Sequence, residues 1–368
     1  MNLDLSIYDR EFNLLGFVDS YSSLLWKRSY FTTGSFRIEC PLTDQNVKLF
    51  QKENILRKKD IMPDGSKRNA DEAGVIEYLY KFEGKKLKYL IAEGRFLSSY
   101  LDRRTIEWTK THSGACGDVV RAFINDCTST ARRAIPGLKI GNLSAFSDRV
   151  DKQATWKNLL SLIEDISATT GHGFRVRPDF VNKGMTFELY DGVDRSVSQI
   201  DHNRVIFSDD YGNLNETINE TSDLFYKDYF YVGGQGEGAE RRVIEFGDKS
   251  ASGLDLREMF VDARDIMLEE EMSSSEYDAL LKTRGLEKQK DCVITDSVEA
   301  TVIPTMNFTY KKDYDLGDIV TIEKGPWGIK SNKRITALME QYKGSVFEIL
   351  PTFGDPLPTK LGGNANEW

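Results

Sequence analysis

The feature that most constrains the fold is a change in the spacing of apolar residues near residue 101. Before this point the pattern alternates, and Phe36, Ile38 and Cys40 are separated by charged residues. A period of two puts every second side chain on the same side of a strand, so it predicts sheets with one buried face. After residue 101, apolar residues recur at intervals of three and four, which predicts helices. The succession of the two periods indicates an α+β protein, and an aromatic content of 11% favours strands.

Two amphipathic helices and a hairpin are expected in the middle of the chain. The first helix covers residues 118–127, and the second has an apolar stripe over residues 156–166 that would bury Trp156. Gly171 follows as the expected C-terminal stop. A hairpin over residues 174–189 completes a small α+β domain.

The last third of the chain again favours strands, interrupted by helices. Residues 226–232 are aromatic and strand-like, and four further strands are expected near the C-terminus. Between them, apolar residues recur at helical spacing over residues 256–267. Ser273 and Glu276 then form a capping box, whose helix is expected to end at Gly285.

Three segments have no regular pattern. Residues 62–66 have turn chemistry, and a polar stretch continues to Gly74, which predicts a long exposed loop. Residues 233–238 contain four glycines, but neither GxGxxG spacing nor a GK[ST] motif follows, so a turn is favoured over a nucleotide site. Residues 354–368 are expected to be a tail without a core of its own.

Composition limits the classes of function. The net charge is −9 and the basic pairs are short and scattered, which argues against a nucleic-acid scaffold. The N-terminus lacks the features of a signal peptide, and no apolar run is long enough to span a membrane. The protein is therefore expected to be made in the cytoplasm. The cysteines form no CxxC pair, so we expect reduced thiols and no zinc site; they are Cys40, Cys116, Cys127 and Cys292.

Candidate metal ligands each have a simpler structural interpretation. An acidic cluster resembles a calcium loop, but glycine stands at position five and aspartate at position six, so a turn entering a strand is the better account. The cluster consists of Asp313, Asp315, Asp318 and Glu323. The histidines are not spaced as metal ligands, and His172 between two glycines fits a turn; they are His112, His172 and His202.

Candidate catalytic groups are equally weak. Cys116 directly precedes a helix and has no identifiable base. The acidic runs at residues 164–165 and 269–271 would point in different directions on a helix rather than face each other across a cleft. We therefore assign no catalytic, cofactor-binding or metal-binding residue. A cell-wall hydrolase that uses carboxylates of residues 101–210 remains one alternative.

Exposed tryptophans leave a second alternative, a carbohydrate- or receptor-binding module. The candidates are Trp108, Trp156 and Trp327. Trp156 is expected in the core because it begins the apolar stripe, whereas Trp327, between Pro326 and Gly328, is the better exposed candidate.

Several short stretches, in the same order, resemble a known family. Residues 23–41 combine Trp26, Tyr30, the Gly34-Ser35-Phe36 turn and the closing Pro41, which resembles the N-terminal signature of tail hub proteins of long-tailed phages. Further matching stretches lie at residues 93–104, 284–288, 314–320, 335–336 and 351–354. Together they resemble the siphophage tail hub family, which is related to the baseplate hubs of contractile phages.

The resemblance implies a β-rich α+β architecture with two tube-like β-barrel domains. The implied division is residues 1–100 for the first barrel, 101–204 for the α+β domain, 205–235 with 292–353 for the second barrel, 236–291 for a helical insertion, and 354–368 for a tail. The chain resembles the N-terminal domain of tail-associated lysins without the lysin extension, so enzymatic activity is not expected.

The resemblance also implies the assembly and its partners. Three copies would form a ring that joins the six-fold tail tube to the three-fold tip and lets DNA pass without specific binding. The implied neighbours are a distal tail protein at the tube end, the tape measure protein, and tip or receptor-binding proteins. The expected location is the virion tail tip, after assembly in the cytoplasm of the bacterial host.

Overall fold

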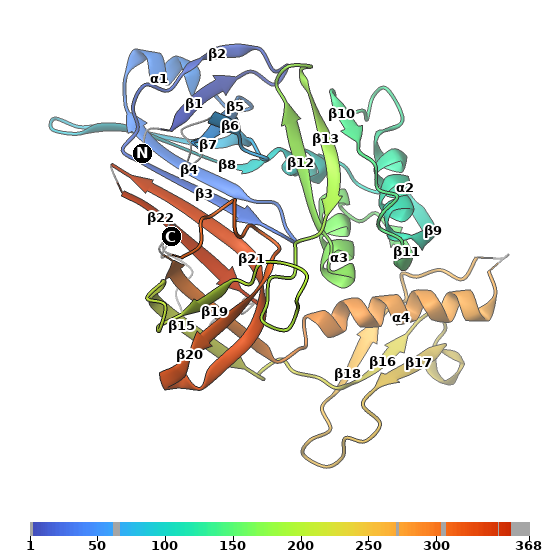
Figure 1. Cartoon of the computed structure of the whole chain (residues 1–368). Helices are drawn as coiled ribbons and strands as arrows, with labels where there is room; N and C mark the ends of the chain where they lie inside the picture. The colour runs from blue at the N-terminus through green and yellow to red at the C-terminus, as the bar shows by residue number, and fades with distance from the viewer. Residues whose placement is uncertain (1–2, 62–66, 270–271, 303–306, 345, 355–368) are drawn as a thin grey trace.

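The computed structural model describes residues 3–61, 67–269, 272–302, 307–344 and 346–354. Within these ranges the chain forms one 14-stranded sheet, three smaller sheets and four α-helices (Figure 1). The path through the large sheet is β15-β19-β22-β21-β3-β4-β8-β7-β5-β1-β2, with β14, β20 and β6 attached beside it. The β-rich α+β class expected from the sequence is confirmed.

The N-terminal part of the large sheet alternates as expected. Phe36, Ile38 and Cys40 lie on its buried side. A short helix that the sequence patterns did not indicate, α1 (Asp44–Leu49), begins at Thr43, whose side chain accepts a hydrogen bond from the backbone of Asn46. The strands are β1 (Asp4–Tyr8), β2 (Leu14–Phe17), β3 (Ser23–Ser29), β4 (Ser35–Pro41), β5 (Ile55–Ile61), β6 (Lys67–Asn69), β7 (Gly74–Glu83) and β8 (Lys88–Phe96).

The C-terminal strands join the same sheet. They are β14 (Ile206–Ser208), β15 (Leu214–Ser222), β19 (Thr295–Val302), β20 (Ile319–Lys324), β21 (Ile329–Lys343) and β22 (Val346–Phe353), with the 3-10 turn η3 (Gly325–Trp327). β21 pairs antiparallel with β3, so that Leu338 lies opposite Arg28 and Glu340 opposite Trp26. The two strand-rich ends of the chain are therefore hydrogen-bonded into one continuous sheet.

The middle of the chain packs its helices against two small sheets. Gly171 ends α3 in the left-handed conformation, as expected, and β12 and β13 form the expected hairpin. The core includes Phe123, Ile163 and Phe187. The elements are the 3-10 helix η1 (Leu97–Arg103), β9 (Thr109–Ala115), α2 (Cys116–Thr128), β10 (Leu138–Ile140), β11 (Arg149–Thr155), α3 (Leu159–Thr170), β12 (Gly173–Asp179) and β13 (Gly184–Tyr190).

The helical insertion expected over residues 236–291 is wrong in its first half. That part folds as strands, and the expected helical stripe over residues 256–267 contains β18. Strand β16, expected in the second barrel, pairs with β17 and β18 in a separate three-stranded sheet (the small sheet), and α4 covers one side of it (Figure 1). The elements are β16 (Tyr229–Gly233), η2 (Gly238–Glu240), β17 (Val243–Gly247), β18 (Glu258–Asp262) and α4 (Ser274–Lys290). The helix prediction failed because Met259 and Val261 face inward while Phe260 faces outward. This is the alternation of a strand, although the apolar residues of the segment also fit a helical spacing.

Two helix boundaries also differ from expectation. α4 does not end at Gly285 but continues to Lys290, because this glycine marks a close approach to the small sheet. A Cβ at Gly285 would lie 2.4 Å from the ring of Phe246 and 2.8 Å from Val232. α3 begins only at Leu159, after the N-cap Asn158, so Trp156 precedes the helix and is exposed rather than buried.

The loop expected between residues 62 and 74 is shorter than predicted. The polar sequence predicted a loop, but strand β6 pairs with β5 inside this stretch, beside the main path of the sheet, where polar sequences are common. Residues 62–66, and the tail from residue 355 onward, lie outside the described residues. Among the described helices, none is long and apolar enough to cross a membrane.

Candidate assembly surfaces

The two ends of the chain meet around a buried arginine on β3. Arg28 points to the same inner side of the sheet as Trp26 and is 2% exposed. Its Nε donates to both carboxylate oxygens of Glu72, at 2.9 and 3.1 Å. Its Nη1 donates to the Tyr310 hydroxyl at 3.0 Å and to Asp315 at 2.5 Å. Burial alone would lower the pKa of Arg28, but the charges of Asp315 and Glu72 outweigh it and raise the pKa.

A buried carboxylate on β21 is the second centre of the same network. Glu340 is fully buried and pairs with Lys58 of β5 and, at 3.3 Å, with Lys311. It also accepts hydrogen bonds from the hydroxyls of Tyr310, at 2.9 Å, and Tyr342, at 2.7 Å. Although burial would raise its pKa, Lys311 and Lys58 hold the pKa of this carboxyl well below its usual range. We call the set Arg28, Lys58, Glu72, Tyr310, Lys311, Asp315 and Glu340 the junction network.

The hairpin of the α+β domain is tied to this junction by charge. Asp71 accepts hydrogen bonds from Arg175 and Arg177 of β12, both at 3.1 Å. It also lies 3.8 Å from Nη2 of Arg28. Burial alone would raise the pKa of Asp71, but Arg175, Arg28 and Arg177 together lower it. Elements from three parts of the chain are therefore held at one place.

Tyr30 fills the space next to the junction network. A Cβ at Gly173 would lie 2.4 Å from its ring, and one at Gly317 would lie 2.3 Å from it. Gly317 also has a φ of +92°, which favours glycine. The Asp318 side chain completes this turn by accepting hydrogen bonds from the backbone of Val193 and from Arg195. The tyrosine and the Gly317-Asp318 turn of the sequence resemblance therefore contact each other.

Sequence reasoning missed the junction network. Its signal was present, because Arg28 and Glu340 both occupy inward positions of alternating strands, where an apolar residue is expected. A charge at such a position requires a buried partner of opposite sign. The partners lie more than 280 residues apart in the case of Lys58 and Glu340, so the spacing could not identify them.

The opposite side of the large sheet is open to solvent and broad. Where β7, β8, β4, β3 and β21 lie side by side, it carries half-buried and exposed residues that include Leu25, Lys27 and Met339. Arg37 of β4 and Glu93 of β8 form an ion pair there. A hollow of about 630 Å³ lies on this side between Met339 and Tyr78. We call this side the outer sheet face, and it is a candidate contact surface.

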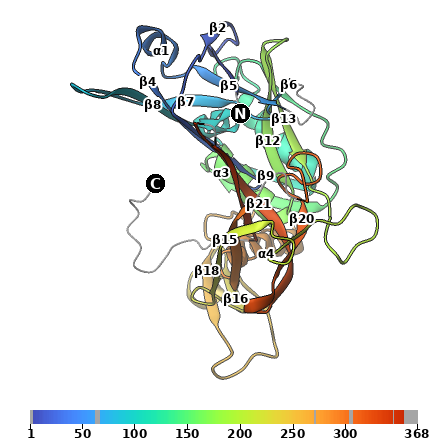
Figure 2. The same cartoon turned by 60° about the vertical axis from the view of Figure 1, so that its left-hand side comes forward.

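The hairpin of β7 and β8 extends beyond the rest of the sheet (Figures 1 and 2). One side of it is aromatic, with Tyr78, Tyr80 and Phe82 exposed and Tyr89 stacked on Phe82 at 5.2 Å. Strand β2, at one end of the sheet path, exposes Leu14, Leu15 and Phe17. Exposed apolar groups gathered in this way are typical of contact surfaces.

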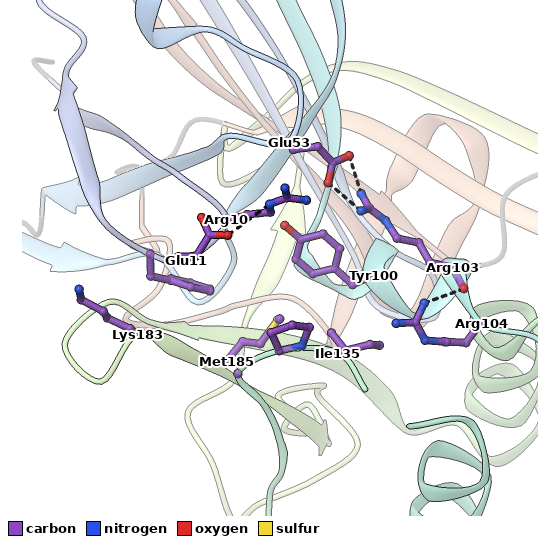
Figure 3. Close-up of a pocket in the computed structure, with 12 residues that line it drawn as sticks. Arg10, Glu11, Glu53, Tyr100, Arg103, Arg104, Ile135, Lys183 and Met185 are labelled. Carbon is purple, nitrogen blue, oxygen red and sulfur yellow. Dashed lines mark hydrogen bonds and ion pairs between the residues drawn. The ribbon is translucent and has the colours of Figure 1, made fainter. Parts of the chain in front are cut away.

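A pocket of about 470 Å³ lies beside η1 (Figure 3). Its charged groups engage one another: Arg103 donates to both oxygens of Glu53, at 2.7 and 3.0 Å, and Arg10 lies 3.3 Å from Glu11. The Tyr100 hydroxyl has no hydrogen-bond partner among the described residues, and burial raises the pKa of Tyr100 to about 12. The pocket therefore offers a shaped, partly apolar surface rather than a matched acid and base.

The acidic groups considered as metal ligands have structural roles. Asp315 pairs with Arg28, Asp318 with Arg195, and Glu323 with Lys330, while Asp313 accepts a backbone hydrogen bond from Thr309. Among the described residues, no group of three or more His, Cys, Asp or Glu side chains could hold a metal ion. The Asp313–Glu323 stretch is thus a turn leading into β20.

The three histidines have separate hydrogen-bond partners. His172 lies in the connection between α3 and β12 and bridges two carboxylates, Asp191 at 2.7 Å and Asp148 at 2.6 Å. His112 lies 2.8 Å from Asp126. His202 is held by backbone hydrogen bonds with the side chain of Gln199.

The remaining sequence candidates also remain separate. All four cysteines are free and buried, and burial raises the pKa of Cys116 to about 11, so its thiolate is disfavoured at neutral pH. Lys157 and Lys152 pair with Asp165, and Glu164 accepts a backbone hydrogen bond from Thr33. The glycines of residues 233–238 connect β16 to η2. Of the acidic run at 269–271, only Glu269 is described, and it accepts a hydrogen bond from Thr111.

The tryptophans include one exposed pair. Trp108 and Trp156 flank the ends of β9 and β11, with ring centroids 5.2 Å apart, and are 71% and 55% exposed. Both have a positive φ, 60° and 52°, which is rare for a bulky residue and costs free energy. Trp327 is also exposed, in the turn before β21.

Proteins of known structure share this fold. Three solved structures are similar: a tail protein from Neisseria meningitidis MC58, prophage tail protein gp18 from Listeria monocytogenes EGD-e, and a chain of the Francisella PdpA–VgrG complex. Their TM-scores are 0.60, 0.56 and 0.51, with sequence identities of 10%, 13% and 10%. The matches cover 96%, 97% and 96% of this chain, and 97%, 95% and 58% of the matched chains, in the same order. A search of curated proteins gave no match.

The fold is that of phage tail proteins, which are structural components of the virion. At the level of sequence, a family model matches residues 4–355. The chain belongs to the Siphovirus ReqiPepy6 Gp37-like protein family.

Proposed function

We propose that this protein is a non-enzymatic hub at the tip of a siphophage tail. Three copies form a ring that adapts the six-fold tail tube to the three-fold tip and encloses a channel for DNA. Family membership and the fold similarity to tail proteins support this proposal.

The continuous sheet is the observation that carries the proposal. Strands from both ends of the chain form its two halves, and the junction network fixes those halves to each other. Breaking such a buried ion pair would leave an uncompensated charge, so the halves are expected to move as one body. Three such double units present six sheet halves, which suits a neighbour with six-fold symmetry.

The proposal includes the implied domain division and partners. The N-terminal strands and the C-terminal strands would each form a tube-like barrel, with the small sheet and α4 as an appendage. The distal tail protein at the tube end, the tape measure protein and the tip proteins would contact the ring, with the outer sheet face and β2 as candidate surfaces. Assembly would take place in the host cytoplasm.

Copy number and position in the particle test the proposal. Phages that lack the protein are expected to make tails without a functional tip. In purified wild-type tails, quantitative mass spectrometry should find three copies, and electron microscopy of a tagged chain should place it where the tube ends. A copy number that is not a multiple of three, a position along the tail shaft, or hydrolysis of peptidoglycan by the purified protein would contradict the proposal.

One observation favours a second candidate function, the binding of a host surface carbohydrate. The exposed pair Trp108 and Trp156 is held in a strained backbone conformation, and strain of this kind gathers at binding sites. If the pair binds a glycan, W108A/W156A particles should assemble normally but adsorb to host cells more slowly. Normal adsorption would remove this candidate.

A further inference from the structure

The hairpin of β7 and β8 carries an unusual combination of groups for this acidic chain. We call residues 78–89 the arm. Its aromatic side presents Tyr78, Tyr80 and Phe82, which are 51%, 41% and 39% exposed, and Leu87 in the turn is 59% exposed. Exposing such large apolar side chains does not stabilise the fold, so their exposure suggests that they contact another molecule.

The arm is also basic. Between residues 78 and 89 there are four lysines and one glutamate, although the whole chain has a net charge of −9. Glu83 pairs with Lys88 across the hairpin. Lys81, Lys85 and Lys86 are exposed and form no ion pair within the described residues. The arm thus offers aromatic rings together with uncompensated positive charge.

A surface of complementary chemistry lies on the small sheet of the same chain. α4 covers one side of the small sheet, and the opposite side faces outward with Tyr229, Tyr231 and Phe260, of which Phe260 is 52% exposed. Glu245 lies opposite Tyr231 on β17 and Glu258 opposite Tyr229 on β18. We call this the small-sheet outer face.

The two glutamates of this face lack cationic partners. Glu258 accepts a hydrogen bond from the Tyr231 hydroxyl at 2.9 Å, and both glutamates are exposed. Neither forms an ion pair within the part of the chain that the structure describes. The guanidinium of Arg241 lies 5.1 Å from the centroid of the Phe260 ring, but its charge is paired with Asp262. The face therefore combines exposed aromatic rings with the unpaired negative charge of two glutamates, the counterpart of the arm.

We propose that the arm of one copy docks on the small-sheet outer face of a neighbouring copy, with the turn lysines Lys85 and Lys86 facing Glu245 and Glu258. Within one chain the two surfaces lie at opposite ends of the molecule and cannot meet (Figure 1). The contact is heterologous, since two different patches meet, and such contacts close into rings when the rotation between copies permits. The inference rests on the proposed trimeric hub and names a contact that holds it.

The occupant is a second copy rather than DNA because of where the charges lie. Lys81 and Lys88 lie on the side of the hairpin opposite the aromatic rings, and Lys85 and Lys86 lie in the turn, so the lysines that can accompany the aromatic side are those of the turn. A matching acidic aromatic face exists on the same chain. The aromatic groups would supply most of the binding energy, and the charges would set partner choice and the rate of encounter. Since a stable interface buries roughly 800 Å² per partner, a 12-residue arm adds to other ring contacts rather than replacing them.

Cross-linking in assembled tails tests the contact directly. The four native cysteines are buried, so introduced cysteines report without interference. In tails that carry F82C and F260C in the same chain, mild oxidation should link chains into dimers and trimers, because docked residues have a high effective concentration. F82C paired with I200C is the matched control, since Ile200 is 87% exposed and lies outside the small-sheet outer face. We expect at least about tenfold more linked chain than in this control.

Charge exchange provides the second measurement. K85E/K86E and E245K/E258K should each reduce incorporation into tails by about tenfold, because each double variant alone places like charges opposite each other. The combination of all four substitutions should restore incorporation, because opposite charges then face each other again. All four positions are exposed, so the chain is expected to fold in each case.

The outcomes separate this contact from the hub itself. Tails with three copies but no F82C–F260C linkage above the control would overturn the contact and leave the hub standing. Linked chains from a protein that is absent from the tail tip would support the contact and overturn the hub. Unchanged linkage in K85E/K86E tails, together with altered DNA retention, would mean that the arm meets DNA and would also overturn the proposal.

Discussion

At the scale of single residues, buried charged side chains are expected to contribute more to the stability of the large sheet than exposed ones. Arg28 is buried and bonded to Glu72, Asp315 and Tyr310. Replacing it by methionine keeps the bulk but leaves these acidic groups without their cation. We expect R28M to lower the free energy of unfolding by about 3–5 kcal/mol, the usual cost of breaking a buried pair. Urea denaturation of the full chain would measure the loss.

The matched control for this prediction is the ion pair on the outer sheet face. Arg37 lies on the same sheet and pairs with Glu93, but both side chains are more than a third exposed. R37M should therefore cost less than about 1 kcal/mol. Equal losses in R28M and R37M would show that the junction network does not carry the stability assigned to it.

His172 makes stability depend on pH. Burial alone would lower the pKa of His172, but hydrogen bonds to Asp191 and Asp148 raise it above the ordinary value of 6.5. A raised folded-state pKa gives stability that is fully present below the unfolded pKa and is lost as pH rises through the folded pKa. The urea midpoint of the wild type should fall as the pH rises from the ordinary value of 6.5 through the raised folded-state pKa, and that fall should be smaller in H172Q. An identical pH dependence in H172Q would rule out this residue as the source.

Residue identities predicted some of these roles and not others. The alternation around Phe36 and Ile38 predicted the buried face correctly, because burial of a strand depends on local periodicity. The partners of Arg28 and Glu340 could not be predicted, because they come from strands and connecting segments, distant in the sequence, that only the completed fold brings together. Trp156 was placed wrongly because an apolar residue can satisfy a helical spacing and still precede the N-cap.

At the scale of elements, α4 shows how a single glycine fixes a packing distance. Gly285 lies within the helix, where a Cβ would come within 2.4 Å of Phe246. Although alanine favours a helix by about 1 kcal/mol over glycine, G285A should loosen the contact between α4 and the small sheet. Faster amide hydrogen exchange in β16 and β17 would report this, with A279G on the same helix as a comparison that weakens α4 without the clash. Slower exchange in G285A would contradict the tight approach.

The elements that sequence patterns predicted well are those stabilised by local signals. The Ser273–Glu276 capping box and the Gly171 stop depend on neighbouring residues alone, and both are present as expected. Strand β18 depends instead on parallel pairing with β16, which lies more than 20 residues earlier in the chain. A stripe of apolar residues could not distinguish this strand from a helix.

At the scale of the whole molecule, the β3–β21 pairing makes the first strand-rich unit depend on the last. In a fragment of residues 1–204, β3 would lose its neighbour β21, and the buried charges of Arg28 and Lys58 would lose Asp315 and Glu340. Such a fragment exposes an unpaired sheet edge with unpaired charges. We expect it to aggregate when expressed alone, as measured by size-exclusion chromatography. A folded, monomeric fragment would show instead that the N-terminal unit is an independent domain.

The small sheet and α4 should be separable from the rest by the same reasoning. β15 and β19 pair antiparallel up to Ser222 opposite Thr295, so the ends of the intervening segment already lie side by side. Replacing residues 223–294 by a two-residue Asn-Gly turn should close these strands as a hairpin and leave the large sheet folded. Lys152, which pairs with Glu287 of α4, would then be exposed to water rather than left buried without a partner.

The shortened chain should therefore keep a cooperative unfolding transition, unlike the 1–204 fragment. It should nevertheless enter tails poorly if the small-sheet outer face receives the arm of a neighbour. Normal tails from the shortened chain would mean that ring formation depends on the continuous sheet alone.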